Sequence, residues 1–188
     1  MLSQLFGRRT PTPESPIPNL PLERVDIGRY MGVWHEIAHL PSIFQRKCKR
    51  DVTATYTLQA DGRVRVHNQC RKADGEMASA VGEARTVDWR DGALKVRFAP
   101  KFLSFLPMVW GDYWILDIDR NYQWALVGGP DCRYLWILSR TPEMASATFE
   151  NLKERARHRG YDVSKLILMA PIIDETLSDE TSSDEPQS

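Results

Sequence analysis

The segment at residues 28–41 decides the fold, and it reads Gly-Arg-Tyr-Met-Gly-Val-Trp-His-Glu-Ile-Ala-His-Leu-Pro. It contains two motifs that require different backbones. His35-Glu36-Ile37-Ala38-His39 has the H-E-x-x-H spacing of zinc peptidases, which lies on a helix. Gly32-Val33-Trp34 is a G-x-W motif, which is typical of the first strand of a small β-barrel. The surrounding sequence therefore decides between a helix and a strand.

The zinc motif depends on helical geometry. In a helix the two histidine side chains lie about 6 Å apart at Cβ, but in a strand the same positions are about 13 Å apart. Zn–N bonds of about 2.0–2.1 Å cannot then join both imidazoles to one ion. Gly28 and Gly32 precede the motif and Pro41 follows it, which leaves too little chain for a long helix. We therefore expect a strand with His35 and His39 on its outer face.

Length and composition are typical of one domain with terminal extensions. The chain has 188 residues, of which 42% are hydrophobic, and this is enough to build a substantial core. Lys plus Arg and Asp plus Glu are balanced at 25 each, so the overall charge gives no reason to expect nucleic-acid binding. No stretch of the sequence has the length and apolarity of a transmembrane helix.

The two ends differ from the middle of the chain. Residues 1–24 are expected to form an extended proline-rich arm, because five prolines fall between Thr10 and Pro21. The start lacks the apolar core of a signal peptide and a cysteine for lipidation, so we expect either no export by that route or a leader omitted from the recorded start. Residues 174–188 contain Asp and Glu but no Lys or Arg, which is typical of a disordered acidic tail. Residues 25–173 are expected to form the domain.

The middle of the chain has the two-residue periodicity of β-strands. Apolar residues alternate with threonines from Val52 to Leu58, and the alternation recurs from Val64 to Cys70 after a turn. Further strands are expected at 82–87, where the strand is shorter, and at 94–98, 113–118, 123–127 and 134–139. With the strand that begins at Trp34 they make eight, and eight antiparallel strands close into a barrel wide enough for one small ligand.

A single helix is predicted after the eighth strand. Thr141 is a suitable N-cap, Pro142 fits the first helical position, and Glu143 favours the positive end of the helix dipole. The apolar stripe of this helix consists of Met144, Phe149, Leu152 and Ala156. Gly160 supplies the stop, and residues 163–169 are expected to add a short final strand.

From about residue 25 to residue 170 the chain resembles the lipocalin family, and within it the bacterial outer-membrane lipocalin and apolipoprotein D group. Four segments carry the resemblance in the same order: Tyr30–Ala38, Val52–Tyr56, Tyr113–Leu116 and Leu135–Pro142. The resemblance implies an all-β fold, namely an eight-stranded antiparallel up-and-down lipocalin barrel with one C-terminal α-helix and a short final strand.

The resemblance also implies structural roles for five signature residues: Gly32, Trp34, Asp119, Tyr122 and Arg140. In the family these signatures meet at the closed end of the barrel. Trp34 would plug the floor, and Arg140 would lie across its indole in a cation–π contact worth about 1–2 kcal/mol. We therefore assign these residues to the fold and not to a ligand site.

Candidate ligand contacts follow from the alternation of side chains along the strands. If Trp34 faces the interior, Glu36 and Ala38 do so as well. The other expected wall residues are Ala54, Tyr56, Val66, Asn68, Leu94, Val96, Phe98, Tyr113 and Trp136. This lining suits an apolar ligand, and the alternative is that the same side chains fill a solid core. A charge on Glu36 would be costly there, so we expect a neutral carboxyl or a hydrogen bond to Tyr56 or Asn68.

Two loops at the expected open end supply candidate rim residues. Arg46 and Lys47 belong to a basic cluster that suits a phosphate or carboxylate head group, although such clusters are often only solvated loop. Phe102, Phe105 and Trp110 lie in a second loop, which is too apolar for an ordinary exposed turn. That loop is expected to cover the mouth, pair with another subunit or contact a bilayer surface.

The three cysteines leave one unpaired if a disulfide forms. Cys70 ends the third strand and Cys48 precedes its hairpin partner, so these two are the candidates for a disulfide. Such a disulfide would imply an oxidising compartment, in tension with the missing leader. Cys132 is expected to be a free thiol in a rim loop.

Together these observations predict a binding protein with no catalysis, cofactor or metal. The expected ligand is a fatty acid or lysophospholipid that enters tail-first, in membrane maintenance or a stress response. One alternative is another apolar ligand, such as a porphyrin or isoprenoid, and the other is a zinc-dependent hydrolase acting through His35, Glu36 and His39. A homodimer and a peripheral membrane contact through residues 99–112 stay open, and the resemblance implies a periplasmic or outer-membrane-associated location.

Overall fold

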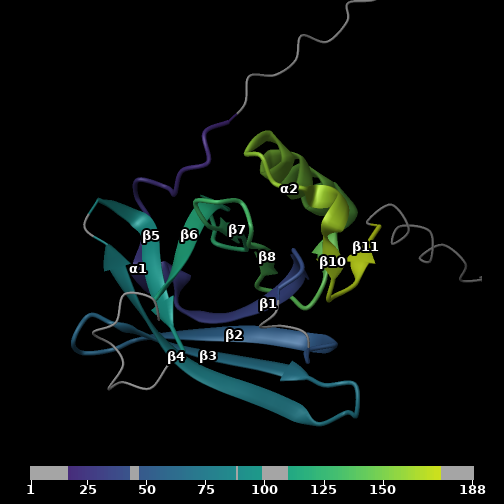
Figure 1. Ribbon diagram of the computed structural model, residues 1–188, viewed down its shortest axis with the longest axis horizontal. Coiled ribbons are helices and arrows are strands. Elements are labelled where there is room, and N and C mark those ends of the chain that lie inside the picture. Colours follow the sequence, from purple (N-terminus) through teal and green to yellow (C-terminus); the bar gives the residue numbers. More distant parts are fainter. Residues whose placement is uncertain (1–16, 43–46, 88, 99–109, 175–188) are drawn as a thin grey trace, which may run out of the picture.

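The structure, a computed structural model, describes residues 17–42, 47–87, 89–98 and 110–174. Its centre is a closed eight-stranded barrel in which each strand pairs antiparallel with the next and the last strand pairs with the first (Figure 1). The strands are β1 (Gly32–His39), β2 (Arg50–Leu58), β3 (Val64–Arg71), β4 (Met77–Val87), β5 (Arg90–Arg97), β6 (Gly111–Ile118), β7 (Trp124–Gly128) and β8 (Leu135–Ser139). The predicted barrel is confirmed.

Two strands begin four or five residues earlier than their sequence patterns indicate. β4 begins at Met77 and not near residue 82, because residues 77–81 pair with the C-terminal half of β3, from His67 to Arg71. This half of β4 is rich in small residues and lacks a strong apolar alternation, so cross-strand hydrogen bonding determines its extent. β5 likewise begins at Arg90.

The closed end of the barrel begins with a short helix, α1 (Ile27–Tyr30), which the sequence pattern did not reveal. Asp26 caps it by accepting a hydrogen bond from the backbone N–H of Arg29 at 3.1 Å. Tyr30 and Trp34 are both buried, and the indole N–H of Trp34 donates to the Tyr30 carbonyl at 2.8 Å. Helix and strand are therefore locked together at the floor of the barrel.

The C-terminal helix α2 (Ser146–His158) starts later than predicted. Thr141 and Pro142 do not begin the helix, because Met144 and Ala145 form a two-residue strand, β9, paired with β11 (Ile172–Ile173). The Thr141 hydroxyl instead donates to the Glu143 carbonyl at 2.8 Å. The predicted apolar stripe does face the barrel, since Phe149, Leu152 and Ala156 pack in one cluster with residues on the outer side of β1, β6, β7 and β8.

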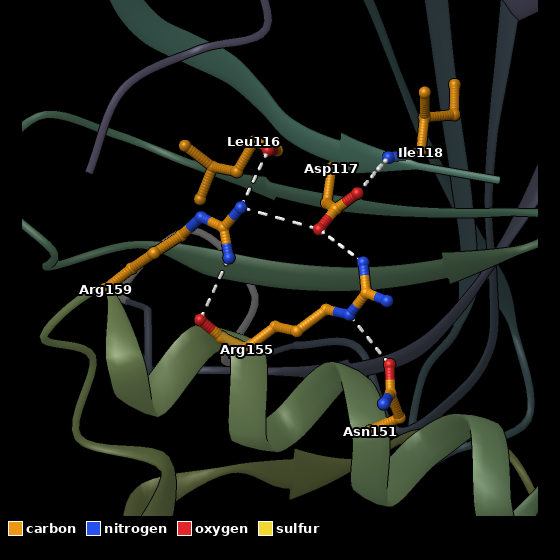
Figure 2. A network of polar contacts seen from close by, with 6 residues as sticks. All are labelled: Leu116, Asp117, Ile118, Asn151, Arg155 and Arg159. Atoms are coloured by element: carbon orange, nitrogen blue, oxygen red, sulfur yellow. Dashed lines mark hydrogen bonds and ion pairs between the residues drawn. The ribbon is translucent and has the colours of Figure 1, made fainter. Parts of the chain in front are cut away.

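A polar network also attaches α2 to the barrel. Figure 2 shows Asp117 of β6 between two arginines of the helix region: Arg155 donates to its carboxylate at 2.9 Å and Arg159 at 3.4 Å. Arg159 additionally reaches the Leu116 carbonyl at 3.3 Å. Because Asp117 is largely buried, these charge-assisted bonds help to fix where the helix lies on the barrel wall.

The described terminal segments run along the barrel. Among residues 163–169 the structure has a 3-10 turn at Val163–Lys165 and then β10 (Ile167–Leu168), which pairs with the C-terminal end of β1. Only the end of the expected final strand is therefore confirmed. Residues 17–24 lie against the domain, where the Leu22 N–H donates to the Ile115 carbonyl at 2.9 Å. The rest of the predicted arm and residues 175–188 of the predicted tail lie outside the described residues.

Candidate functional site

The closed end of the barrel gathers the five signature residues. The Arg140 guanidinium lies 3.8 Å from the centroid of the Trp34 ring and donates to the Val33 and Arg29 carbonyls at 2.8 and 2.9 Å. Gly32 has a φ of +97°, and a Cβ there would stand 3.3 Å from the Arg140 guanidinium. These contacts seal the floor, which agrees with a structural role for the three residues.

The turn between β6 and β7 completes the closed end. The Asp119 carboxylate accepts hydrogen bonds from the N–H groups of Asn121 and Gln123 at 2.9 and 3.2 Å. Tyr122 has a φ of +60°, and its hydroxyl accepts from the Asp26 N–H at 2.9 Å. The turn is thereby tied to the residue that caps α1.

The barrel interior contains most of the predicted wall residues. One cluster unites the floor with aliphatic and aromatic side chains of the strands, and it includes Trp34, Ala54, Tyr56, Val66, Leu94, Val96, Tyr113 and Trp136. Asn68 is placed on the same face by its register opposite Ala54. Phe98 follows the end of β5 and is 46% exposed, with its ring against Gly82, so it is not buried in the wall.

The first strand contains a β-bulge that changes which side chains face inward. Glu36 pairs with Leu138 and Ala38 with Ile137, so one extra residue of β1 lies between these pairs. After the bulge the alternation is reversed. Ala38 packs on the helix side of the barrel, and His39 lies opposite Trp136 on the inner face. The prediction that Ala38 faces inward and His39 outward is therefore wrong.

Glu36 and His39 form a buried pair as a result of the bulge. The Nδ1 atom of His39 lies 2.6 Å from a carboxylate oxygen of Glu36, and both side chains are less than a tenth exposed. The buried Glu36 carboxylate thus has a charged or hydrogen-bonding partner, which offsets the cost of burying it. His39 was not among the predicted partners, which were Tyr56 and Asn68.

His35 and His39 do not have the arrangement that a shared zinc ion would need. His35 pairs with Thr53 and Ser139 on the outer side of the strand, whereas His39 lies inside, so the wall separates the two imidazoles. Partial burial lowers the pKa of His35. Within residues 17–42, 47–87, 89–98 and 110–174, no group of three His, Cys, Asp or Glu side chains is placed to hold a metal ion.

Three tyrosine hydroxyls form a chain above the floor. The Tyr113 hydroxyl lies 2.7 Å from that of Tyr30 and 2.8 Å from that of Tyr56. Burial is the main cause that raises the pKa of Tyr56 to about 12, and it also raises the pKa values of Tyr30 and Tyr113 well above their usual range. Sequence reasoning missed Tyr30, because the short helix that turns it into the core has no periodic pattern.

This tyrosine chain predicts a loss of stability in alkali. Tyr56 of the unfolded chain ionises near pH 10, whereas the folded protein keeps the proton up to about pH 12, so unfolding becomes easier as the pH rises through this window. At pH 11 Tyr56 alone is expected to lower the free energy of unfolding by about 1.4 kcal/mol relative to pH 8. Urea unfolding at both pH values tests this. Tyr56→Phe should show the smaller decline, and an identical decline in both proteins would contradict the assignment.

Aromatic rings continue from the tyrosine chain toward the open end. Tyr113 stacks on Trp136 with 6.4 Å between ring centroids, and Trp136 stacks on Tyr134 at 6.0 Å with planes 9° apart. Tyr134 was not among the predicted ligand contacts, although it stands two residues before Trp136, just ahead of β8. The stacked rings give the interior one continuous aromatic wall.

The predicted rim is described only in part. Lys47 is exposed in the segment before β2, while Arg46, Phe102 and Phe105 lie outside the described residues. Trp110 differs from the prediction. Its ring lies 4.5 Å from the Arg85 guanidinium and 5.1 Å from that of Arg97, two residues whose register places them on the outer face of the sheet. In this structure Trp110 thus contacts the outer wall and not the mouth.

The cysteines occupy two environments near the open end. Cys48 and Cys70 form a disulfide with 5.5 Å between their Cα atoms, which joins the segment before β2 to β3. Cys132 is a free thiol next to the N-terminal segment, where its sulfur accepts from the Asn19 amide at 3.3 Å. Burial and the nearby Asp131 raise the pKa of Cys132, so the thiol form is favoured.

Comparisons with known proteins agree with this geometry. Residues 25–171 match the lipocalin-like domain family. Temperature-induced lipocalin-1 of Arabidopsis thaliana is 47% identical over 145 residues, covering 76% of this chain and 77% of that protein. The outer membrane lipoprotein Blc of Escherichia coli (strain K12) is 40% identical over 144 residues, with 76% and 77% covered. The chain belongs to the lipocalin family.

Solved structures show the same fold at lower identity. Insecticyanin from the tobacco hornworm Manduca sexta superposes with a TM-score of 0.60 at 20% identity, covering 87% of this chain and 88% of that one. Apocrustacyanin C1 gives a TM-score of 0.61 at 13% identity, with 78% and 79% covered. Within the part of the chain that is described, no helix is long and apolar enough to cross a membrane.

Proposed function

We propose that this lipocalin binds an amphipathic lipid, a fatty acid or a lysophospholipid, and carries or stores it inside the barrel. Membership of the family supports binding of a small apolar ligand. The observation that carries the proposal is the barrel interior itself, in which aliphatic side chains and the aromatic wall of Tyr113, Trp136 and Tyr134 surround a few polar groups. The role is binding and not catalysis.

Mass spectrometry of organic extracts from natively purified protein tests the identity of the ligand. We expect a fatty acid or a lysophospholipid in an amount comparable with that of the protein. A porphyrin or an isoprenoid in its place would support the alternative ligand class and overturn the lipid assignment. Protein that has been delipidated and refilled with the extracted lipid provides the control.

The expected position of the head group gives a second test. Arg46 and Lys47 precede β2 in the sequence; Lys47 is exposed at the open end, and Arg46 lies outside the described residues. Reversing both charges (Arg46→Glu with Lys47→Glu) should weaken binding of an anionic lipid roughly tenfold, since each surface charge contributes up to about 1 kcal/mol. Lys153→Glu on α2 is the control for a charge reversal outside this segment. Unchanged affinity in the double variant would contradict a head group at this position.

The names of the Blc relatives suggest where the protein acts. They are outer membrane lipoproteins, and we propose an association with the cell envelope in membrane maintenance or a stress response. The apolar segment at residues 99–112 is our candidate for a peripheral membrane contact or for pairing in a homodimer. Flotation with lipid vesicles and light scattering distinguish these two outcomes.

A further inference from the structure

The kinds of polar side chain on the inner face of the barrel bear on which ligand can bind there. Among the described strand residues that share the face of Trp34, Glu36 is the only carboxylate, and no lysine or arginine is placed on this face by the strand register. His39 pairs with Glu36. A carboxylate that entered with a ligand would therefore find no lysine or arginine of these strands to pair with.

Asn68 supplies a hydrogen-bond acceptor on this face. Its Oδ1 atom is buried and has no hydrogen-bond partner in the described part of the protein. The cross-strand neighbours on both sides, Ala54 and Ala80, carry no polar side-chain atoms that could satisfy it. Because a buried acceptor without a donor is destabilising, a ligand that brings a donor gains affinity there.

From these two observations we propose that the barrel selects lipids that bury an uncharged hydroxyl, which donates a hydrogen bond to the Asn68 side-chain oxygen. A lipid that buries a carboxylate is disfavoured, because an ionised carboxylate only accepts hydrogen bonds and no lysine or arginine of these strands offsets the cost of burying its charge. A methyl ester carries no charge, but it also has no hydrogen-bond donor for the Asn68 oxygen. This inference rests on the proposed function, since it concerns the ligand of the same interior.

Three ligands with one hydrocarbon chain length separate these effects: a long-chain alcohol, the corresponding fatty acid and its methyl ester. Binding to the delipidated full-length protein is followed by the change in intrinsic tryptophan fluorescence at pH 8. We expect the alcohol to bind roughly three- to tenfold more tightly than the methyl ester, which is the range for one neutral hydrogen bond. A fatty acid whose carboxylate stays at the rim gains nothing from Asn68, so Asn68→Leu should leave its affinity unchanged.

Variants on one strand assign the preference to Asn68. Asn68→Leu should bring the affinity for the alcohol down to that for the methyl ester, and Asn68→Ala serves as a second variant if the larger side chain disturbs folding. Gln69→Leu makes the same change one residue along β3 on the outer face and should retain the preference. Circular dichroism verifies that each variant is folded.

The possible results separate this inference from the proposed function. Equal affinity of the wild-type protein for the alcohol and the methyl ester, or an undiminished preference in both Asn68 variants, would overturn the inference while leaving a lipid-binding barrel. Failure of all three ligands and of lysophospholipid to bind would overturn the proposed function as well. Selective binding of the alcohol that depends on Asn68 would establish the inference and would support lipid binding inside the barrel.

Discussion

Replacing Trp34 by alanine is expected to lower the free energy of unfolding by about 3–5 kcal/mol. The side chain is completely buried at the floor of the barrel. Its removal leaves a cavity, ends the contact of the Arg140 guanidinium 3.8 Å above the ring, and removes the indole donor to the Tyr30 carbonyl. Since domains of this size are stable by about 5–15 kcal/mol, the variant should retain only part of the wild-type stability.

Urea unfolding followed by circular dichroism measures this loss. Trp89→Ala is the matched control, because Trp89 is 54% exposed and its ring contacts are a T-shaped pair with Trp114 and the Arg90 guanidinium 5.5 Å away. We expect this control to lose no more than about 1 kcal/mol. If the two variants proved equally stable, Trp34 would not be the plug that the structure indicates.

Most of the barrel could be predicted because each strand carries its own periodic signal. The alternation from Val52 to Leu58 and from Val64 to Cys70 required no knowledge of neighbouring strands. The start of α2 could not be predicted in this way. Thr141, Pro142 and Glu143 have good local helix-start chemistry, but pairing of Met144 with Ile172, far along the chain, outweighs it.

The candidate site was harder to predict because one bulge changes the direction of every later side chain on its strand. Strict alternation from Trp34 turns Ala38 inward and His39 outward, and the bulge in β1 reverses both. The residues 35–39 contain no glycine or proline that would mark the bulge. The buried pair of Glu36 and His39 was therefore hidden in what looked like a zinc motif.

Aromatic contacts from loops were equally hidden. Sequence placed Trp110 in an apolar rim loop, but the ring lies over the Arg85 and Arg97 guanidinium groups on the outer wall. A cation–π contact of this kind depends on where two distant strands bring their arginines, and no local pattern records it. In contrast, Cys48 and Cys70 were identifiable, because the β2–β3 hairpin fixes their proximity.

Removing that disulfide is expected to have the second largest effect on stability. Cys48 and Cys70 are 22 residues apart, and closing a loop of this length stabilises a protein by about 3 kcal/mol through the entropy of the unfolded chain. Cys48→Ser with Cys70→Ser should therefore shift the urea midpoint downward by a corresponding amount. The segment that carries Lys47 would also lose its covalent link to β3, so binding of an anionic lipid should weaken in parallel.

A reductant separates the disulfide from the effects of the substitutions. Dithiothreitol should destabilise a Cys132→Ser protein, which keeps the disulfide and has no free thiol, and it should leave the double serine variant unchanged. Equal midpoints with and without reductant in the Cys132→Ser protein would mean that the bond contributes nothing to folding. Because a disulfide persists only in an oxidising environment, its full oxidation in natively purified protein would also support the proposed association with the envelope.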